Sequence, residues 1–287
     1  MADAGPGSLG DQVREAWLTT LALNAAFDRP WVEAATAWAV AAAGGSPATV
    51  VDVGCGAGGA SAAFAGQGSG TVVAFDPDPR LVEVARGRLA EAGLAGRVRL
   101  AAAAIGGLPV PPGTADVVWA SGVIHHVPDQ QAAVDELAGL LRPGGVLALV
   151  EGGLPLRCLP HEIGLGRPGL EARLDEARAR WFTDLRAELG GPPMPYGWPE
   201  ALARAGLVDV RVRAFVAEAT PADPTGAEIA RQHLVSARDE LGDRLAPDDR
   251  ATVARLLDPG DPAWLGGRHD LVVTAVRTVQ IGTAPAG

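Results

Sequence analysis

The chain has 287 residues, of which 34 are acidic and 24 are basic, so its formal charge at pH 7 is −10. This acidic balance argues against a nucleic-acid partner, because binding to phosphates depends on clustered Lys and Arg. Apolar residues make up 48% of the chain, enough to bury a large core, and they exclude a disordered chain. All 24 basic residues are Arg, so no mechanism that needs a catalytic or phosphate-binding lysine is available.

The cysteine content and the N-terminal sequence favour a cytoplasmic protein. Cys55 and Cys158 are too few to form a disulfide framework or a zinc site. Residues 1–10 lack the basic segment and apolar stretch of a signal peptide. The uncharged stretch 34–51 is interrupted at 44–47 by Gly-Gly-Ser-Pro, which leaves it shorter than the ~20 residues of a membrane span. We therefore expect neither secretion nor a membrane partner.

Helical and strand-like segments alternate through the first half of the chain. Residues 1–45 show helical spacing of apolar residues, and β-branched runs then alternate with amphipathic segments. The sequence predicts strands at 49–53, 71–75, 98–102, 115–120 and 146–151, and helices at 81–92 and 130–141. This order indicates βαβ units in a Rossmann-like doubly wound parallel sheet.

The second half is richer in helices. Helices are predicted at 170–189, 199–205, 225–241 and 248–257, and strands at 208–215 and 271–279. Thr225 and Glu228 form a capping-box pattern that predicts the start of the third of these helices at Thr225. We divide the chain into an N-terminal helical cap (1–47), a cofactor-binding core (48–152), a helical insert that acts as a substrate lid (153–206) and a C-terminal part with the last sheet strands (207–287).

A glycine-rich turn follows the first predicted strand. Gly54, Gly56 and Gly59 fit the G-x-G-x-x-G pattern, in which glycines let the backbone approach an anionic ligand at a helix N-terminus. The pattern is weak by itself, since a purely structural glycine turn has the same appearance. Asp76, 22 residues after Gly54, ends the second predicted strand and is placed to accept hydrogen bonds from ribose hydroxyls. The alternative role for Asp76 is that of a cap for the helix after Pro77. Together the turn and the acid indicate a cofactor that contains adenosine.

Five segments, in this order and spacing, resemble class I S-adenosylmethionine-dependent methyltransferases of the small-molecule branch. They are DVGCGAG (52–58), FDPDP (75–79), LPVP followed by ADVVWA (108–120), SGVIHHV (121–127) and LLRPGGVL (140–147). The resemblance covers residues 48–152, and it implies a seven-stranded sheet whose last strand is antiparallel. It also implies S-adenosylmethionine as the cofactor.

The resemblance assigns ten residues to the cofactor. The glycine turn would hold the methionine end, Asp52 would help to neutralise its amino group, and Asp76 would bind the ribose. Relatives often carry an acid at the adenine amino group, and Ala104 stands at that position here. The adenine would then depend on Ile105 and backbone hydrogen bonds, at a loss of roughly 1–2 kcal/mol of binding free energy. The full set is Asp52, Gly54, Cys55, Gly56, Gly58, Asp76, Pro77, Ala104, Ile105 and Ser121.

His125 and His126 follow the fourth predicted strand at the carboxyl edge of the sheet. A histidine can accept a proton near neutral pH, which suits a general base for a hydroxyl or an acidic carbon. We prefer His125 as the residue that faces the pocket, and the alternative is that one or both rings only bond the backbone of a tight loop. Weaker candidates for contact with the substrate are His161, Trp181, Tyr196, Trp198 and His233. Ordinary loop polarity or core packing explains these five equally well. We expect no metal site, because arginines interleave the acidic residues 239–249 and indicate surface salt bridges.

The sequence therefore predicts an enzyme that transfers a methyl group to a small molecule, as in the tailoring of secondary metabolites. Two alternatives remain open at this point. The protein could bind the cofactor without transferring a methyl group, as a scaffold or for another reaction. It could also be a nicotinamide-dependent oxidoreductase, although it lacks the Tyr-x-x-x-Lys pair. The identity of the acceptor and the methylated atom are not encoded in a recognisable pattern, and helices outside the sheet could mediate a homodimer.

Overall fold

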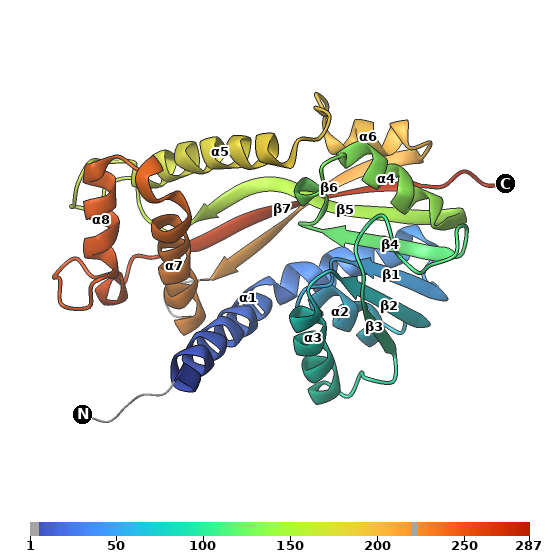
Figure 1. The fold of residues 1–287 in the computed structure, drawn as a ribbon, viewed down its shortest axis with the longest axis horizontal. Coiled ribbons are helices and arrows are strands. Elements are labelled where there is room, and N and C mark those ends of the chain that lie inside the picture. The colour runs from blue at the N-terminus through green and yellow to red at the C-terminus, as the bar shows by residue number, and fades with distance from the viewer. Residues whose placement is uncertain (1–5, 220–222) are drawn as a thin grey trace. The chain divides into compact units, whose positions relative to one another are not determined.

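The computed structural model describes residues 6–219 and 223–287 (Figure 1). Its strands are β1 Thr49–Val53, β2 Thr71–Asp76, β3 Val98–Ala102, β4 Ala115–Ser121, β5 Leu141–Arg157, β6 Val208–Ala219 and β7 Val273–Thr283. Its α-helices are α1 Pro6–Ala42, α2 Gly59–Gly66, α3 Pro79–Glu91, α4 Gln130–Gly139, α5 Leu170–Leu189, α6 Trp198–Arg204, α7 Pro224–Ser236 and α8 Pro247–Leu257. A short 3-10 helix, Ile124–His126, follows β4.

The contacts group these elements into two units. The first unit contains Pro30–Pro155, Ala179–Ala217 and Ala275–Gly287, and it holds most of the sheet. The second contains the described residues up to Arg29, together with Leu156–Arg178 and Glu218–Thr274. No described helix is long and apolar enough to cross a membrane.

The seven strands form one sheet in the order β3-β2-β1-β4-β5-β7-β6. The first five strands pair in parallel, with Val51 opposite Val118 and Val118 opposite Leu147. Because side chains alternate across a strand, this row and the row two residues further on, with Ala120 and Leu149, face the same side of the sheet. There they join α4 and α6 in one buried cluster with Leu137 and Leu202. The predicted Rossmann-like class is therefore confirmed.

The opposite face of the sheet is covered by α2. Trp119, which alternates with Val118 along β4, is fully buried, and its ring meets that of Phe64 edge-on at 5.6 Å between centroids. The two faces explain why the predicted strands are almost continuously apolar, since both sides of a parallel sheet are buried.

β5 is longer than the predicted strand at 146–151, which placed a turn at Pro143-Gly144-Gly145. The structure carries the strand through this segment, since Leu141 pairs with Ala115 and the Gly145 carbonyl accepts a hydrogen bond from the Ala284 N–H at 2.8 Å. In the C-terminal part of β5, Gly153 lies against Val276 of β7. The start of β5 thus meets the end of β7, so β7 runs antiparallel to β5 as expected (Figure 1).

The predicted start and end of the helix at 225–241 are wrong. α7 begins at Pro224, and its N-cap is Asp223, whose carboxylate accepts a hydrogen bond from the Thr225 N–H at 2.8 Å. Asp223 precedes a proline that lacks an N–H, so it satisfies the first free amide of the helix and leaves Thr225 inside the first turn. The α-helix ends at Ser236 and is followed by one wider turn, Ala237–Leu241.

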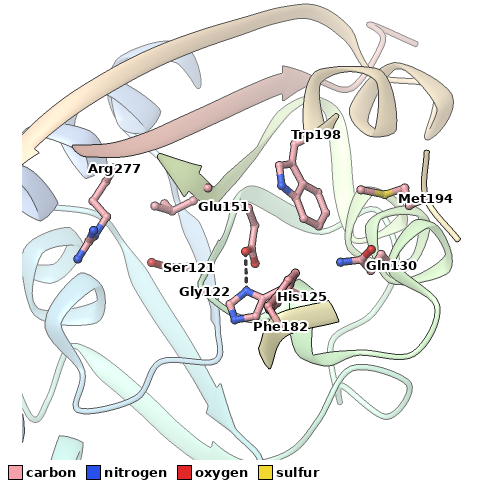
Figure 2. A pocket seen from close by; sticks show the side chains of 11 residues that line it. Ser121, Gly122, His125, Gln130, Glu151, Phe182, Met194, Trp198 and Arg277 are labelled. Carbon is pink, nitrogen blue, oxygen red and sulfur yellow. Dashed lines mark hydrogen bonds and ion pairs between the residues drawn. The ribbon is translucent and has the colours of Figure 1, made fainter. Parts of the chain in front are cut away.

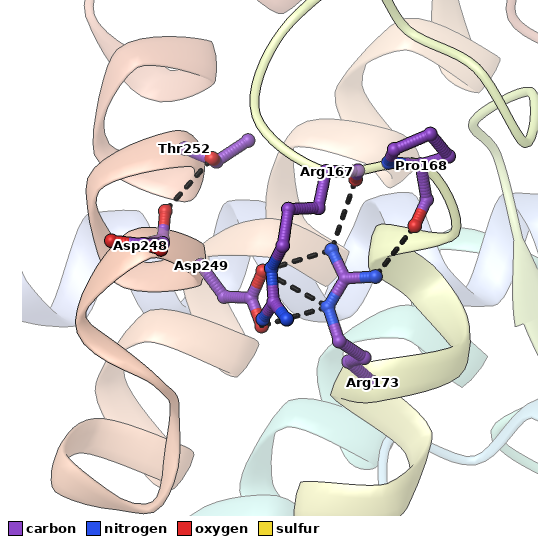
Figure 3. Close-up of polar contacts among 6 residues, drawn as sticks. All are labelled: Arg167, Pro168, Arg173, Asp248, Asp249 and Thr252. Atoms are coloured by element: carbon purple, nitrogen blue, oxygen red, sulfur yellow. Dashed lines mark hydrogen bonds and ion pairs between the residues drawn. The ribbon is translucent and has the colours of Figure 1, made fainter.

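In the second unit, one carboxylate joins helix α8 to the segment around the start of α5. Asp249 is only 3% exposed and accepts hydrogen bonds from Arg173 at 2.9–3.0 Å and from Arg167 at 3.2 Å (Figure 3). The acidic residues near it were expected to make surface salt bridges. For Asp249 that expectation is wrong, because its charge is buried and is neutralised by two arginines. Within residues 6–219 and 223–287, no three His, Cys, Asp or Glu side chains gather as metal ligands would.

Candidate functional site

The glycine turn after β1 adopts backbone conformations that only glycine tolerates well. Gly54, Gly56 and Gly58 have φ values of 70°, 52° and 80°. A Cβ atom on Gly54 would lie 2.1 Å from a methyl carbon of Val123, whereas one on Gly56 would meet nothing within 4 Å. Gly54 thus lets the loop after β4 pack against the turn, while Gly56 faces open space.

The carboxylate of Asp76 holds the glycine turn from the end of β2. It is 6% exposed, and it accepts hydrogen bonds from the N–H groups of Gly56 and Asp78, each at 2.9 Å. The cap of helix α3 is Asp78, which bonds the Arg80 N–H at 2.9 Å, so the alternative role of Asp76 as that cap is wrong. A carboxylate can accept about four hydrogen bonds, and Asp76 therefore retains acceptor capacity for two hydroxyls such as those of a ribose.

Asp52 lies beneath the turn. It is 1% exposed, and its carboxylate accepts a hydrogen bond of 2.5 Å from the Ser61 hydroxyl in the first turn of α2. Burial raises the pKa of Asp52 from 3.8 to about 6, and the bond from Ser61 opposes the shift. The bond ties the end of β1 to α2, and contact of Asp52 with a ligand's amino group stays a prediction.

The other residues assigned to the cofactor surround the same edge of the sheet. Cys55 is buried, and burial raises the pKa of its thiol, so the thiol is unreactive. Pro77 and Ala104 are exposed, whereas Ile105 is half-buried against the main core. Ser121 ends β4 and lines a cavity. Their contacts with a cofactor stay predictions.

That cavity has a volume of about 530 Å³ and opens at the carboxyl ends of β4 and β5 (Figure 2). Its walls combine apolar and polar side chains with two glycines. The lining residues are Ser121, Gly122, His125, Gln130, Val150, Glu151, Gly152, Phe182, Met194, Trp198 and Arg277, all of them in the first unit.

A hydrogen-bonded pair of titratable side chains lies in this cavity. The Nδ1 atom of His125 is 2.8 Å from one oxygen of Glu151, and the other oxygen accepts the N–H groups of Val123 and Ile124 at 2.9 and 2.7 Å. Glu151 is 4% exposed, and the side chain of His125 is 27% exposed. Because a carboxylate can only accept, Nδ1 carries the proton and Nε2 of the neutral ring is left as a proton acceptor.

Glu151 was not among the residues predicted for the site. It ends the predicted strand 146–151, so an acid at the carboxyl end of a parallel strand was the available signal. The partner that gives this acid its role is 26 residues away in the sequence, and only the pairing of β4 with β5 brings the two together.

His126 lies beside His125, with 4.0 Å between the ring centroids, but it does not line the cavity. Partial burial, followed by the neighbouring His125, lowers the pKa of His126. Of the two histidines, the structure therefore places His125 in the cavity, which is the one preferred from the sequence.

The C-terminal part of α5 holds the loop that carries the histidines. The guanidinium of Arg186 donates hydrogen bonds to the carbonyl oxygens of His125, Val127 and Pro128 at 3.1, 2.6 and 2.9 Å. The ring of Phe182, one helical turn earlier, lies 5.9 Å from that of His125. The first unit thus contains a positively charged clamp that fixes the backbone of the histidine loop.

The weaker substrate candidates differ in their surroundings. Trp198 lines the cavity. Trp181 does not line it, but the next residue, Phe182, does. The hydroxyl of Tyr196 donates to the side chain of Gln131 at 3.0 Å, and its ring packs against the core. His161 and His233 belong to the second unit, where burial lowers the pKa of His233 to about 4. A role for any of the five in binding stays a prediction.

Comparison with known proteins finds matches to part of this chain. Residues 51–149 match the sequence profile of the family described as methyltransferase domain. Methyltransferase GfsG of Streptomyces halstedii is 37% identical over 102 residues, which cover 36% of this chain and 37% of GfsG. The 27-O-demethylrifamycin SV methyltransferase of Amycolatopsis mediterranei is 50% identical over 42 residues, 15% of each chain. The chain thus matches little more than a third of the length of the first relative and far less of the second.

Solved structures agree on the fold. A candidate methyltransferase from Bacillus halodurans C-125 superposes with a TM-score of 0.53 at 16% identity, over 88% of this chain and 99% of that one. The [4+2]-cyclase SpnF gives a TM-score of 0.50 at 20% identity, over 89% and 81% of the two chains. The chain shares its Rossmann-like fold with these solved structures, and residues 51–149 match the model of the methyltransferase domain family. The resemblance drawn from the sequence is therefore confirmed for this part of the chain.

Proposed function

We propose that this protein is an S-adenosylmethionine-dependent methyltransferase that acts on a small molecule, with His125 as the general base. The observation that carries the proposal is the His125–Glu151 pair, which lines a cavity at the carboxyl edge of the sheet in a methyltransferase domain. Ligands of open α/β sheets bind at this edge. The family match favours methyl transfer over the nicotinamide alternative.

The cofactor's part is to supply a methyl group already activated on a sulfonium. The residues that would hold it are the glycine turn, whose Gly56 faces open space, and Asp76, whose carboxylate has acceptor capacity left for hydroxyls. Ser121 lines the cavity and ends β4, which pairs with the strand before the glycine turn, so the acceptor would lie between Ser121 and the His125–Glu151 pair.

The residues of the chain would then move one proton. An acceptor hydroxyl in the cavity gives its proton to Nε2 of His125, while the Nδ1–H continues to donate to Glu151. The buried carboxylate stabilises the imidazolium that results. Phe182, Met194 and Trp198 line the cavity with apolar surface and would exclude water around a bound acceptor. A base placed in this way contributes typically 10²- to 10⁴-fold to the rate.

The class of acceptor is proposed from the cavity and from the relatives. A volume of about 530 Å³ suits a small molecule, since ligand pockets commonly measure roughly 300–1,000 Å³. One relative is named for the methylation of a rifamycin, which supports a role in secondary metabolism. The homodimer and the cytoplasmic location remain predictions, as does the assignment of residues 153–206 as a substrate lid.

The proposal is tested in two steps. Titration calorimetry should show binding of S-adenosylhomocysteine, and Asp76→Asn should weaken that binding without unfolding the protein. Methyl-labelled cofactor incubated with hydroxylated macrocycles and aromatics should then give a labelled product, and His125→Ala should slow its formation. Tight binding of a nicotinamide cofactor with no response to S-adenosylhomocysteine would overturn the proposal. Binding without transfer to any acceptor would favour the non-methylating alternative.

A further inference from the structure

The cavity contains one positive charge that has no partner among residues 6–219 and 223–287. Glu151 and Arg277 are the lining residues with a formal charge of fixed sign, and both oxygens of Glu151 are already occupied by His125 and by two backbone N–H groups. Arg277 is half-buried, and no described residue forms an ion pair or hydrogen bond with its guanidinium. A guanidinium stays protonated in proteins, so removing it from water without a partner costs free energy.

Two glycines in the C-terminal part of β5 set the position of Arg277. Gly153 has a φ of 124°, and a Cβ atom on it would lie 2.1 Å from the Val276 carbonyl oxygen and 3.2 Å from the Cα of Arg277. β7 therefore passes closer to β5 at this point than any other residue at 153 would allow. Gly152, with a φ of 78°, leaves the space beside it without a side chain and lines the same cavity as Arg277.

The opposite wall of the cavity is apolar at Trp198 and Met194, with the amide of Gln130 beside them. Figure 2 shows Arg277 on one side, with Ser121 and Glu151 between it and the group formed by Trp198, Met194 and Gln130. A ligand that matches these walls has an apolar body toward Trp198 and Met194 and an anionic group toward Arg277. The planar guanidinium presents paired N–H donors that fit the two oxygens of a carboxylate.

We propose that Arg277 is a binding residue for a carboxylate of a molecule held in this cavity. This inference rests on the proposed function for the identity of the two molecules that could supply the carboxylate. One is the acceptor, whose apolar body would occupy the far wall. The other is the amino-acid end of the cofactor, since Ser121, which the resemblance assigns to the cofactor, lines the same cavity.

The first arm of the test measures the cofactor's carboxylate. Calorimetry compares S-adenosylhomocysteine with 5′-methylthioadenosine, which keeps the adenosine and the thioether but lacks the amino-acid end. If the cofactor supplies the carboxylate, Arg277→Met weakens S-adenosylhomocysteine about 10- to 100-fold and leaves 5′-methylthioadenosine unchanged. Arg277→Lys, which keeps the charge but not the paired donors, gives an intermediate loss. Arg211→Met, at an exposed arginine of β6, is the matched control and changes neither affinity.

The second arm uses the protein without cofactor and a simple acid with an apolar body. 4-Phenylbutyrate is compared with its neutral amide, 4-phenylbutanamide, on the wild type and on Arg277→Met. If the cavity takes the carboxylate of an acceptor, the wild type binds the acid about tenfold or more tightly than the amide, and Arg277→Met abolishes the difference. A response in either arm supports the proposal and identifies the source, whereas no dependence on Arg277 in both arms overturns it. Failure of the wild type to bind S-adenosylhomocysteine would refute the proposed function, and the second arm would still decide the role of Arg277.

Discussion

Replacement of Glu151 by Gln tests whether this residue sets the protonation of His125. The two side chains have nearly the same shape, but Gln has one oxygen and one NH₂ group where Glu has two oxygens. In the wild type, one oxygen of Glu151 accepts hydrogen bonds from the N–H groups of Val123 and Ile124 at 2.9 and 2.7 Å. The oxygen of Gln is therefore required there, because the reverse orientation would leave two backbone donors unpaired at about 1–3 kcal/mol each.

With its oxygen fixed in this way, the new glutamine side chain turns its NH₂ group toward Nδ1 of His125, which in the wild type lies 2.8 Å from the second oxygen of Glu151. Nδ1 must then accept, and the ring proton moves to Nε2, which can no longer act as a base. The same change of tautomer in a serine-protease triad costs about 10⁴-fold in turnover. We expect kcat to fall by about 10²- to 10⁴-fold, or about 3–5 kcal/mol in activation free energy, with the affinity for S-adenosylhomocysteine unchanged.

Two measurements check this prediction. Nitrogen-15 NMR of labelled histidine reports which ring nitrogen of His125 carries the proton, and it needs no acceptor. Turnover with an acceptor found by methyl labelling gives the loss in kcat, and the double variant with His125→Ala should lose no more than His125→Ala alone. An Nε2 that stays unprotonated in Glu151→Gln, or a turnover equal to that of the wild type, would refute the argument.

Three further changes test other parts of the molecule. Arg186→Met removes three hydrogen bonds to the histidine loop, so amide exchange in residues 124–127 should accelerate and stability should fall by about 1–3 kcal/mol. Arg86→Met, on the exposed surface of α3, should leave the exchange unchanged. The folded pKa of Asp52 is raised to about 6, so its contribution to stability is present below pH 4 and lost as the pH rises through 6. In urea unfolding, the free energy of unfolding of Asp52→Asn should therefore rise by about 3 kcal/mol relative to that of the wild type between pH 4 and pH 7. A difference between the two proteins that does not change with pH would contradict the burial argument. The folded pKa of His233 is lowered to about 4, so stability is lost as the pH falls from 6.5 toward 4. Over that range, the free energy of unfolding of His233→Leu should fall by about 3 kcal/mol less than that of the wild type. Equal losses in the two proteins would show that the ring is solvated in the folded protein.

Local patterns predicted the parts of the fold that depend on nearest neighbours in the sequence. The continuous apolar run of β1, the glycines after it and the acid at the end of β2 each lie within a few residues of the feature that they determine. The cap of α7 is also a local feature, because Asp223 stands directly before a proline that lacks an N–H. The capping-box pattern at Thr225 nevertheless predicted a start inside the first turn of the helix. The extension of β5 through Gly144 and Gly145 was missed because its pairing partners, Ala115 and Ala284, are distant in the chain.

The cofactor side of the candidate site was predicted better than the acceptor side for the same reason. Asp76 meets the glycine turn because adjacent parallel strands end at one edge, a rule that follows from the order of elements. Phe182 and Met194 come from segments whose approach to His125 depends on how α5 packs, and no periodicity in the sequence reveals that packing.

The sequence by itself determined that a parallel sheet carries a glycine turn, an acid and a histidine pair at its carboxyl edge, because each follows from residue type and spacing along the chain. Only the tertiary structure decided which groups those histidines meet. Glu151 is placed on Nδ1 of His125 by the pairing of β4 with β5, and Arg277 is placed in the cavity by the close passage of β7 past Gly153. Both contacts arise from strand register between segments 26 or more residues apart, and register is set by packing across the whole sheet.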